Sequence, residues 1–560
     1  MNPLLVLHLH GTQEEMGSQH GHLLRAHGGG QRALEAYQSL PERLMLARYK
    51  RSSDRMLSHL IHPLVGIALG RLEQARPAPY LARTQAFYAA LELPASSARY
   101  LGVMDAFQNV VGTVTRWGFV SFAQRAASAL PPACSSLAVW GDASADGRLL
   151  HARNFDFPGI GVWDRWPTIV FCNPDEGLRY GFVTMRGADA PGVTAFNEAG
   201  LTVAMHTRFH RDVTLDGVMA VDLGHEIARY ATSLDDAVRI ARGRRIASTW
   251  GLSVSSARER RALVLEVAAS GVQVVLPAPS EDFVGTTNRY RHPALKVDEV
   301  APTACFIEHC EARYGRLQTW ARRGGLDVDD LKRMLAEHGD AGSEGERAAG
   351  GVLAQPITVK SVVADPERRC IHVATGDVPA ARGPWVEVPW AWMEESGSEV
   401  VSPPQTPGFG SRYAEGASGQ AYRHYVEAVR LEQQTAPVTA MEAHIDAAVA
   451  LDPGDPTWRF LAGALHLRRG AFAEGLAHLE QGLRGEHSPF HRGRMLLWAS
   501  RAAEVSGEAE LARGYRRELL TISHPLLAGH HAAAWREGSR PWTATRLRGI
   551  PVDLTLVDAG

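Results

Sequence analysis

Short hydrophobic runs separated by turns dominate the chain between residues 136 and 276. Stretches rich in β-branched, aromatic and leucine residues alternate with Asp-Gly and Asn-Glu-Ala-Gly turns, and they lie at 137–140, 168–171, 180–183, 193–196 and 263–267. Runs of this length with such turns are typical of antiparallel hairpins. We therefore predict antiparallel sheets in this part of the chain.

Other stretches follow helical spacing instead. Residues 217–230 place apolar side chains three and four positions apart, and Ser233 precedes a second such run at 237–241 as an expected helix cap. Residues 20–130 also show mostly helical spacing. Because strands and helices occur in separate blocks, an α+β layered architecture is favoured over a doubly wound sheet.

The composition changes near residue 394, where Ser, Gly and Pro become frequent, and we expect a linker over 396–419. Residues 420–525 are almost wholly helical, with Gly463, Gly475 and Gly482 placed where paired helices would come close. That spacing resembles about three degenerate tetratricopeptide repeats, which would imply a protein partner. A helical cap over the first domain explains the pattern equally well. Residues 526–560 are expected to form a C-terminal tail.

Composition and charge exclude several classes of protein. The 560 residues are 45% hydrophobic, and 59 Lys and Arg balance 61 Asp and Glu. This indicates a globular protein and gives no reason to expect a nucleic-acid or membrane partner. The first residues lack a basic region, and no apolar run approaches the roughly 18 residues that span a bilayer, so we predict a cytoplasmic location.

The five cysteines are few, scattered and odd in number, which argues against a disulfide framework. Cys305 and Cys310 flank His309, but one such group offers too few ligands for a zinc site. We therefore expect neither a metal nor a cofactor.

One segment carries groups suited to nucleophilic chemistry. Cys134 follows two prolines at the start of an expected strand, an Asp-Gly turn comes twelve residues later, and Arg153-Asn-Phe-Asp156 follows that turn. A hairpin here would bring the guanidinium of Arg153 and the carboxylate of Asp156 alongside the thiol. A cation beside a thiol favours the thiolate.

The order of Cys, strand, Asp-Gly and Arg-Asn-x-Asp resembles the N-terminal-nucleophile hydrolases of the isopenicillin N acyltransferase (acyl-coenzyme A:6-aminopenicillanic acid acyltransferase) family. Choloylglycine hydrolases are similar more distantly. Further segments that look like parts of that family follow in the same order, at 11–21, 197–201, 286–290, 313–317, 358–365 and 371–379. The resemblance covers about residues 5–392 and implies a four-layer αββα sandwich of antiparallel sheets.

The resemblance also implies residue roles. Cys134 would be the nucleophile, Arg153 would lower the pKa of its thiol and help to bind substrate, and Asp156 would orient the α-amine. Asn288 would donate its amide to the oxyanion. Arg316 would pair with Asp156 or complete the charge network, and the acyl site would be lined by His206 and Thr207. The sequence departs from the family at Arg289, where a His is common, and at Ala133, where the acyltransferase has a Gly.

Amide chemistry explains why such an enzyme would cut itself. An internal cysteine lacks a free α-amine, whereas an N-terminal cysteine carries a base with a pKa near 8 within reach of its own thiol. Residues 1–133 are thus expected to be a mostly helical prosegment, cut off between Ala133 and Cys134, and residues 134–395 the catalytic part. A chain ending near Glu394 should then still mature.

The expected substrate is an amide of a small acylated amine or a peptide, with acyl-coenzyme A as a further donor implied only by the resemblance. Water would resolve an acyl-Cys134 thioester by hydrolysis, and an amine would resolve it by acyl transfer. The alternative from another class is a catalytically idle fold that serves as a scaffold for its helical repeats.

Overall fold

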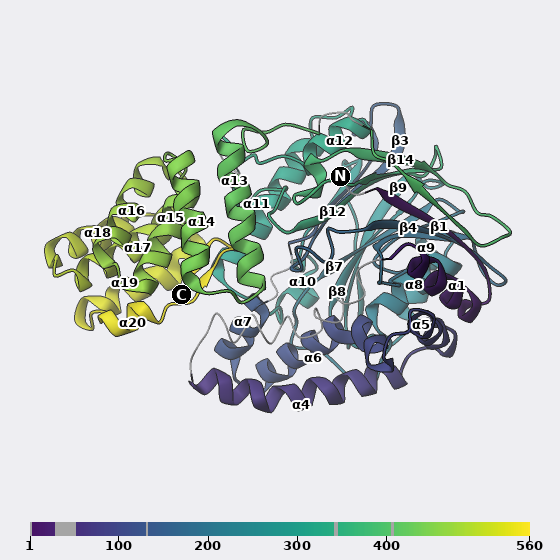
Figure 1. The fold of residues 1–560 in the computed structure, drawn as a ribbon, viewed down its shortest axis with the longest axis horizontal. Coiled ribbons are helices and arrows are strands. Elements are labelled where there is room, and N and C mark those ends of the chain that lie inside the picture. The colour runs from purple at the N-terminus through teal and green to yellow at the C-terminus, as the bar shows by residue number, and fades with distance from the viewer. Residues whose placement is uncertain (1–2, 29–51, 130–132, 341–344, 405–407) are drawn as a thin grey trace.

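The computed structural model describes residues 3–28, 52–129, 133–340, 345–404 and 408–560 (Figure 1). Two sheets with helices on their outer faces make up the larger part of the molecule. A bundle of helices lies beside it and contains the C-terminus. This arrangement confirms the α+β class followed by an all-helical region.

The first sheet has nine strands in the order β10-β9-β8-β7-β6-β5-β4-β1-β15. Its neighbours are antiparallel except β1 and β4, which are parallel. The strands are β1 (Leu4–Gly11), β4 (Pro167–Pro174), β5 (Tyr180–Met185), β6 (Thr194–Asn197), β7 (Leu201–Thr207), β8 (Trp250–Ser256), β9 (Arg261–Ala268), β10 (Gly271–Val275) and β15 (Gly397–Val401). The predicted runs between 168 and 267 therefore form this sheet.

The second sheet has six strands in the order β11-β2-β3-β12-β13-β14. Its strands are β2 (Ser135–Gly141), β3 (Gly147–Asp156), β11 (Phe283–Thr286), β12 (Thr358–Asp365), β13 (Cys370–Ala374) and β14 (Trp385–Pro389). The sheets face each other across a core that joins Leu4 and Phe171 of the first to Val362 and Ile371 of the second.

Helices cover both outer faces and complete four layers. The nine-stranded sheet is covered by α1 (Gln13–Ala26), α8 (Ala220–Tyr230) and α9 (Leu234–Arg242), while α11 (Ala304–Ala321) and α12 (Val328–Leu335) cover the six-stranded sheet. Ser233 caps α9 by accepting from the Asp236 amide, as the sequence predicts. The remaining elements here are α4 (Ser52–Gln74), α5 (Ala78–Ala90), η1 (Ala95–Gly102), α6 (Val103–Arg116), α7 (Val120–Ala129), α10 (Pro293–Lys296) and η2 (Ala380–Arg382).

The part of the chain before Cys134 is integrated into the fold. Besides its helices it supplies β1, which lies between β4 and β15 inside the nine-stranded sheet. Arg83 on α5 forms a two-pronged ion pair with Asp189, with both N···O distances 2.8 Å, and both side chains are buried. Breaking the backbone at residue 133 would therefore leave this part bound to the rest.

The region expected to be a linker, 396–419, is not irregular throughout. Residues 397–401 form β15, which pairs antiparallel with β1, and α13 begins at Gly416. The edge strand escapes sequence analysis because its partner lies almost 400 positions earlier and its own side chains are mostly exposed. The chain after Glu394 thus contributes to the first domain.

In the helical region six helices pack in sequence order, each against the one that follows it. Gly463 and Gly475 lie face to face, and a Cβ on either would sit 3.1 Å from the carbonyl oxygen of the other. These glycines therefore permit the close helix approach predicted from their spacing. The helices are α13 (Gly416–Gln433), α14 (Val438–Leu451), α15 (Pro456–Arg469), α16 (Phe472–Gly485), α17 (Pro489–Val505) and α18 (Ala509–Thr521).

The C-terminal residues form regular elements and return to the first domain. They comprise η3 (Pro525–Leu527), α19 (Ala528–Ser539), α20 (Ala544–Arg548), β16 (Val552–Asp553) and β17 (Asp558–Ala559). Leu556 packs against Phe306 and Cys310 of α11, and the Leu554 carbonyl accepts from the Tyr425 hydroxyl at 2.7 Å. These contacts tie the predicted tail to both domains.

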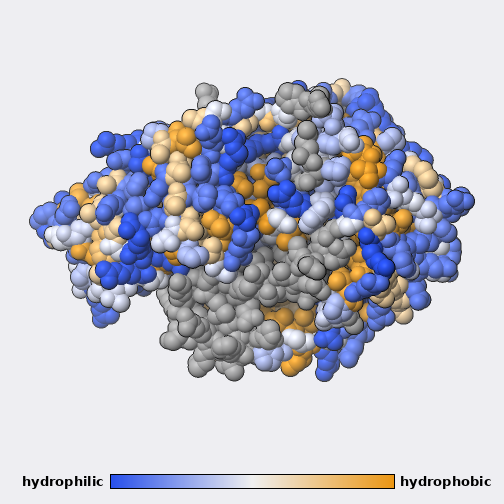
Figure 2. All heavy atoms as spheres, viewed as in Figure 1, coloured by the Kyte–Doolittle hydropathy of each residue, from blue (hydrophilic) through white to orange (hydrophobic). Residues whose placement is uncertain are grey.

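The outer surface is largely polar on the face shown in Figure 2. At the helical end, hydrophobic residues appear in small separate groups among hydrophilic ones. Within the described ranges, no helix combines the length and the apolar character needed to cross a bilayer.

Candidate active site

Strand β2 of the six-stranded sheet places Cys134 deep in the molecule. Cys134 directly precedes β2, is 1% exposed, and lies beside the end of β3. The Asp156 carbonyl accepts from the Ala133 amide at 3.3 Å and from the Cys134 thiol at 3.7 Å. The predicted hairpin therefore forms, and Gly147, the first residue of β3 after its turn, has a φ of +73°.

Arg153 and Asp156 both lie close to the thiol, as predicted. The Arg153 guanidinium is buried and donates to the backbone carbonyls of Val193 and Met205 and to the Thr194 hydroxyl. These contacts hold the cation between the two sheets. Asp156 is fully buried at the end of β3.

The Asp156 carboxyl is only partly satisfied. One oxygen, Oδ1, accepts from the Thr358 hydroxyl on β12 at 2.6 Å, whereas Oδ2 is buried and has no hydrogen-bond partner among the described residues. Burial raises the pKa of Asp156 to about 7, although Arg313, Thr358 and Arg153 act in the opposite direction. A carboxyl with a bare oxygen and such a pKa can accept or hold a proton near neutral pH.

The arginine that joins this site is Arg313, not Arg316. Arg313 Nη1 donates to the Ala133 carbonyl, to the Cys134 carbonyl at 2.8 Å and to the Ser135 hydroxyl at 2.8 Å. Arg316 instead forms an ion pair with Glu337 at 2.6 Å. The expectation that Arg316 pairs with Asp156 is therefore wrong.

Helical spacing explains this correction. The buried face of α11 carries Phe306, Cys310, Arg313 and Leu317, three or four positions apart, so Arg313 points into the protein. Arg316 lies off that face. The family resemblance indicates the right segment, 313–317, but not the right residue, which the helical periodicity of buried positions identifies as Arg313.

Asn288 lies in the same network. Its side-chain oxygen accepts from Arg313 Nη2 at 3.3 Å, and its amide donates to the Thr207 carbonyl at 3.0 Å. The amide expected to serve an oxyanion is thus engaged by the Thr207 backbone in the uncut chain. His206, also predicted here, is fully buried, and its Nε2 lies 2.8 Å from the Ser136 hydroxyl.

Electrostatics at the thiol are mixed. Burial raises the pKa of the Cys134 thiol, and Asp156 acts in the same direction, whereas Arg153 and Arg313 favour the thiolate. Arg153 therefore acts in the predicted direction, but desolvation outweighs it while the site is closed.

The helical region contacts the loop that follows Asp156. Gln433, at the end of α13, accepts from the backbone amides of Gly159 and Ile160, each at 2.9 Å. Tyr422 of α13 belongs to the same buried core as Ala133 and Phe157. Helix α13 therefore supports the site, and the expectation that a chain ending near Glu394 matures no longer follows.

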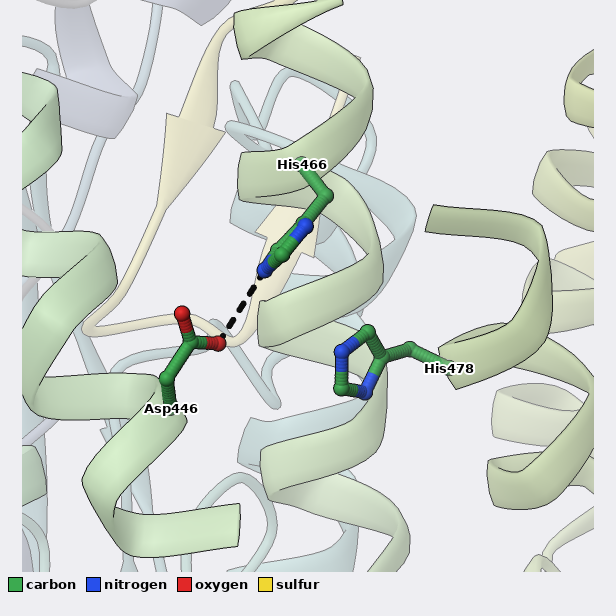
Figure 3. A group of neighbouring side chains, drawn as sticks. All are labelled: Asp446, His466 and His478. Atoms are coloured by element: carbon green, nitrogen blue, oxygen red, sulfur yellow. Dashed lines mark hydrogen bonds and ion pairs between the residues drawn. The ribbon is translucent and has the colours of Figure 1, made fainter. Parts of the chain in front are cut away.

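Potential metal ligands lie elsewhere. Asp446, His466 and His478 come together from α14, α15 and α16, outside the site around Cys134 (Figure 3). The Cys305 thiol lies 3.3 Å from His309 Nε2 and 2.8 Å from Arg494 Nη1, so a cation already contacts this sulfur.

No family model matches the chain. An uncharacterized protein of Archaeoglobus fulgidus is 30% identical over 142 residues, which are 24% of this chain and 23% of that protein. The chain therefore matches less than a quarter of the length of this curated relative.

Two solved structures align with part of the chain. The Caenorhabditis elegans ortholog of N-acylethanolamine-hydrolyzing acid amidase is 14% identical, and the match covers 42% of this chain and 93% of that chain at a TM-score of 0.31. A mutant of the conjugated bile acid hydrolase from Clostridium perfringens is 10% identical, and the match covers 50% of this chain and 99% of that chain at a TM-score of 0.32.

Proposed function

We propose that the chain cuts itself between Ala133 and Cys134 and then uses Cys134, with its freed α-amine, to break the amide bond of a small acylated amine or a peptide. The observation that carries this proposal is the contact between Arg313 and the Ala133 carbonyl, at the bond next to a buried thiol. A guanidinium donor on that oxygen is what a developing oxyanion requires.

The cutting step needs few groups. The Cys134 sulfur can reach the Ala133 carbonyl carbon through a five-membered ring. The S–C bond forms as the C–N bond breaks, the thiol proton passes to the departing nitrogen, and water then opens the thioester to an Ala133 carboxylate. Arg313 Nη1 donates to the oxygen that becomes negative in this step.

The cut chain would gain the base that an internal cysteine lacks. The new α-amine would form at Cys134, whose thiol donates to the Asp156 carbonyl at 3.7 Å, and Asp156 Oδ2 is buried without a partner among the described residues. An ammonium or amine donating to that oxygen would satisfy it and hold the base next to the thiol. The substrate acyl group would then pass to Cys134 as a thioester.

The fate of the thioester depends on which nucleophile enters. Water gives hydrolysis, and an amine gives acyl transfer, with acyl-coenzyme A as a further acyl donor. An idle scaffold is the alternative, but the side chains of Cys134, Arg153, Asp156 and Arg313 are all buried together. Burying an incompletely paired carboxyl beside a thiol costs stability and serves no purpose in an idle fold.

Trapping the acyl-enzyme tests this function. Purified cut protein is incubated with a panel of amides that differ in acyl length, quenched in acid, and analysed by mass spectrometry of the peptide that begins at Cys134. An acyl mass on that peptide is expected for at least one amide. Acylation elsewhere, or release of product by a Cys134→Ala variant, would contradict the assignment.

A further inference from the structure

Three polar side chains in the helical region converge from three successive helices. Asp446 lies on α14, His466 on α15 and His478 on α16, and they point toward a common gap between these helices (Figure 3). Each offers one ligand atom, and these atoms all lie within 4.8 Å of one another. The distance from His466 Nε2 to Asp446 Oδ1 is 3.1 Å.

The spacing is close to that of a tetrahedral metal site. Zinc binds imidazole nitrogen and carboxylate oxygen at about 2.0–2.2 Å, so neighbouring ligand atoms lie roughly 3.3–3.5 Å apart around the ion. The His466 to Asp446 pair already has nearly this separation. Because all the ligand atoms lie within 4.8 Å of one another, the His478 ring needs a shift of at most about 1.5 Å, which a half-buried side chain on a helix surface can make.

The surroundings supply both negative charge and access. Glu442, one turn before Asp446, lies 3.6 Å from His466 Nε2, is 7% exposed, and has an Oε2 without a hydrogen-bond partner among the described residues. Its other oxygen is held by Arg469 at 2.7 Å. The Asp446 side chain is 42% exposed, so an ion and a water ligand can reach the group from solvent.

Two neighbouring arginines oppose binding. Arg459 Nη1 lies 3.2 Å from His478 Nδ1, and Arg469 Nη2 lies 3.4 Å from His466 Nδ1. A ring that binds a metal through Nε2 carries its proton on Nδ1, which cannot accept from a guanidinium. Binding therefore requires these two exposed or half-exposed arginines to turn away from the rings.

We propose that Asp446, His466 and His478 bind one Zn²⁺ ion, with water as the fourth ligand. This departs from the expectation that the chain has no metal site, and it is independent of the chemistry at Cys134. Three protein ligands and a water match the ligand types that zinc prefers. The ion would tie α14, α15 and α16 together across the surface of the helical region.

Zinc binding is measured on the purified full-length protein by competition with a chromophoric chelator. We expect one ion per chain, and a higher midpoint of thermal unfolding when zinc is present. His478→Ala removes a ligand, so it should weaken binding by more than the roughly 10–100-fold lost when a residue that only hydrogen-bonds to a ligand is removed. His424→Ala is the matched control, because His424 pairs with His444 at 3.0 Å outside the group.

A second variant keeps the test informative if His478→Ala affects folding. Arg459→Gln replaces a donor beside His478 Nδ1 with an amide oxygen that can accept from it, so zinc affinity should rise by about 10-fold. Weaker or unchanged binding in Arg459→Gln would overturn the proposal. So would wild-type protein that binds no zinc, or equal losses in His478→Ala and His424→Ala.

The absorption spectrum of bound Co²⁺ distinguishes this site from a site that includes a cysteine. Co²⁺ bound by nitrogen and oxygen ligands shows no thiolate-to-metal charge-transfer band, whereas binding at Cys134 or Cys305 would show one. In wild-type protein we expect the visible absorption of bound Co²⁺ without a thiolate band. In His478→Ala we expect this absorption to be lost. A thiolate band in the wild-type spectrum that is unchanged in His478→Ala would place the ion at a cysteine and refute the assignment.

Discussion

Replacing Arg313 with Met should slow self-cleavage while the thiol and its neighbours stay in place. In the structure Arg313 Nη1 is the side-chain donor to the Ala133 carbonyl, the oxygen on which negative charge develops. Loss of one oxyanion donor typically costs about 10²–10³ in rate, or roughly 2.7–4 kcal/mol of transition-state stabilisation. We expect a slowing of that order for Arg313→Met. A smaller slowing is expected for Arg313→Lys, which keeps the positive charge but loses the planar set of N–H donors of the guanidinium.

Arg316→Met is the matched control. Arg316 lies on the same helix, three residues further on, but pairs with Glu337 outside the site. Its loss should leave the cleavage rate within about twofold of wild type, because its guanidinium contacts Glu337 and not the Ala133 carbonyl.

The assay follows the ratio of full-length to cut chain over time after translation in a cell-free system, read by intact mass. Because Arg313 also donates to Asn288 and Ser135, each variant is also made with Cys134→Ala and its free energy of unfolding is measured. A slow variant that remains folded supports the catalytic role. Wild-type cleavage in Arg313→Met, or equal slowing in Arg316→Met, would refute the reasoning.

Three further changes have defined outcomes. Cys134→Ala should remain a single chain on prolonged incubation, and cutting in this variant would exclude Cys134 as the nucleophile. Burial raises the pKa of Asp156 to about 7 in the folded chain, so its carboxyl should contribute a loss of stability of about 1.4 kcal/mol for each pH unit between about pH 4 and 7. Denaturant titrations should therefore show that stability falls more steeply with pH in uncut Cys134→Ala than in the same protein with Asp156→Asn, and equal slopes in the two proteins would contradict this. Gln433→Leu leaves two buried amides unpaired and should cost about 1–3 kcal/mol each in unfolding experiments, whereas Gln434→Ala, on an exposed side chain, should cost little.

Features that depend on nearby residues, such as the hairpin and the helix cap, could be predicted from the sequence. The hairpin that joins Cys134 to Asp156 follows from hydrophobic alternation around an Asp-Gly turn, and the cap at Ser233 follows from its acidic first turn. The layered α+β arrangement followed from the segregation of strands and helices. The hairpin and the cap depend on residues within about twenty positions of one another.

Contacts between residues far apart in the chain could not be predicted from the sequence. Strand β15 forms because β1 offers an edge to it, and Gln433 is important because two backbone amides of a loop 274 and 273 residues earlier donate to its side chain. The same holds for Asp446, His466 and His478, which meet only when three helices stack. Arg313 differs, since helical spacing alone distinguishes it from Arg316.

Self-cleavage before Cys134 is tested by the identity of the amino terminus in the mature protein. The purified chain is separated under denaturing conditions, and the larger fragment is analysed by intact mass and by terminal sequencing. We expect fragments of 133 and 427 residues, the latter being 560 minus 133, with the second beginning Cys134-Ser135-Ser136. An active protein that contains only the uncut chain, or a terminus at any other residue, would contradict this.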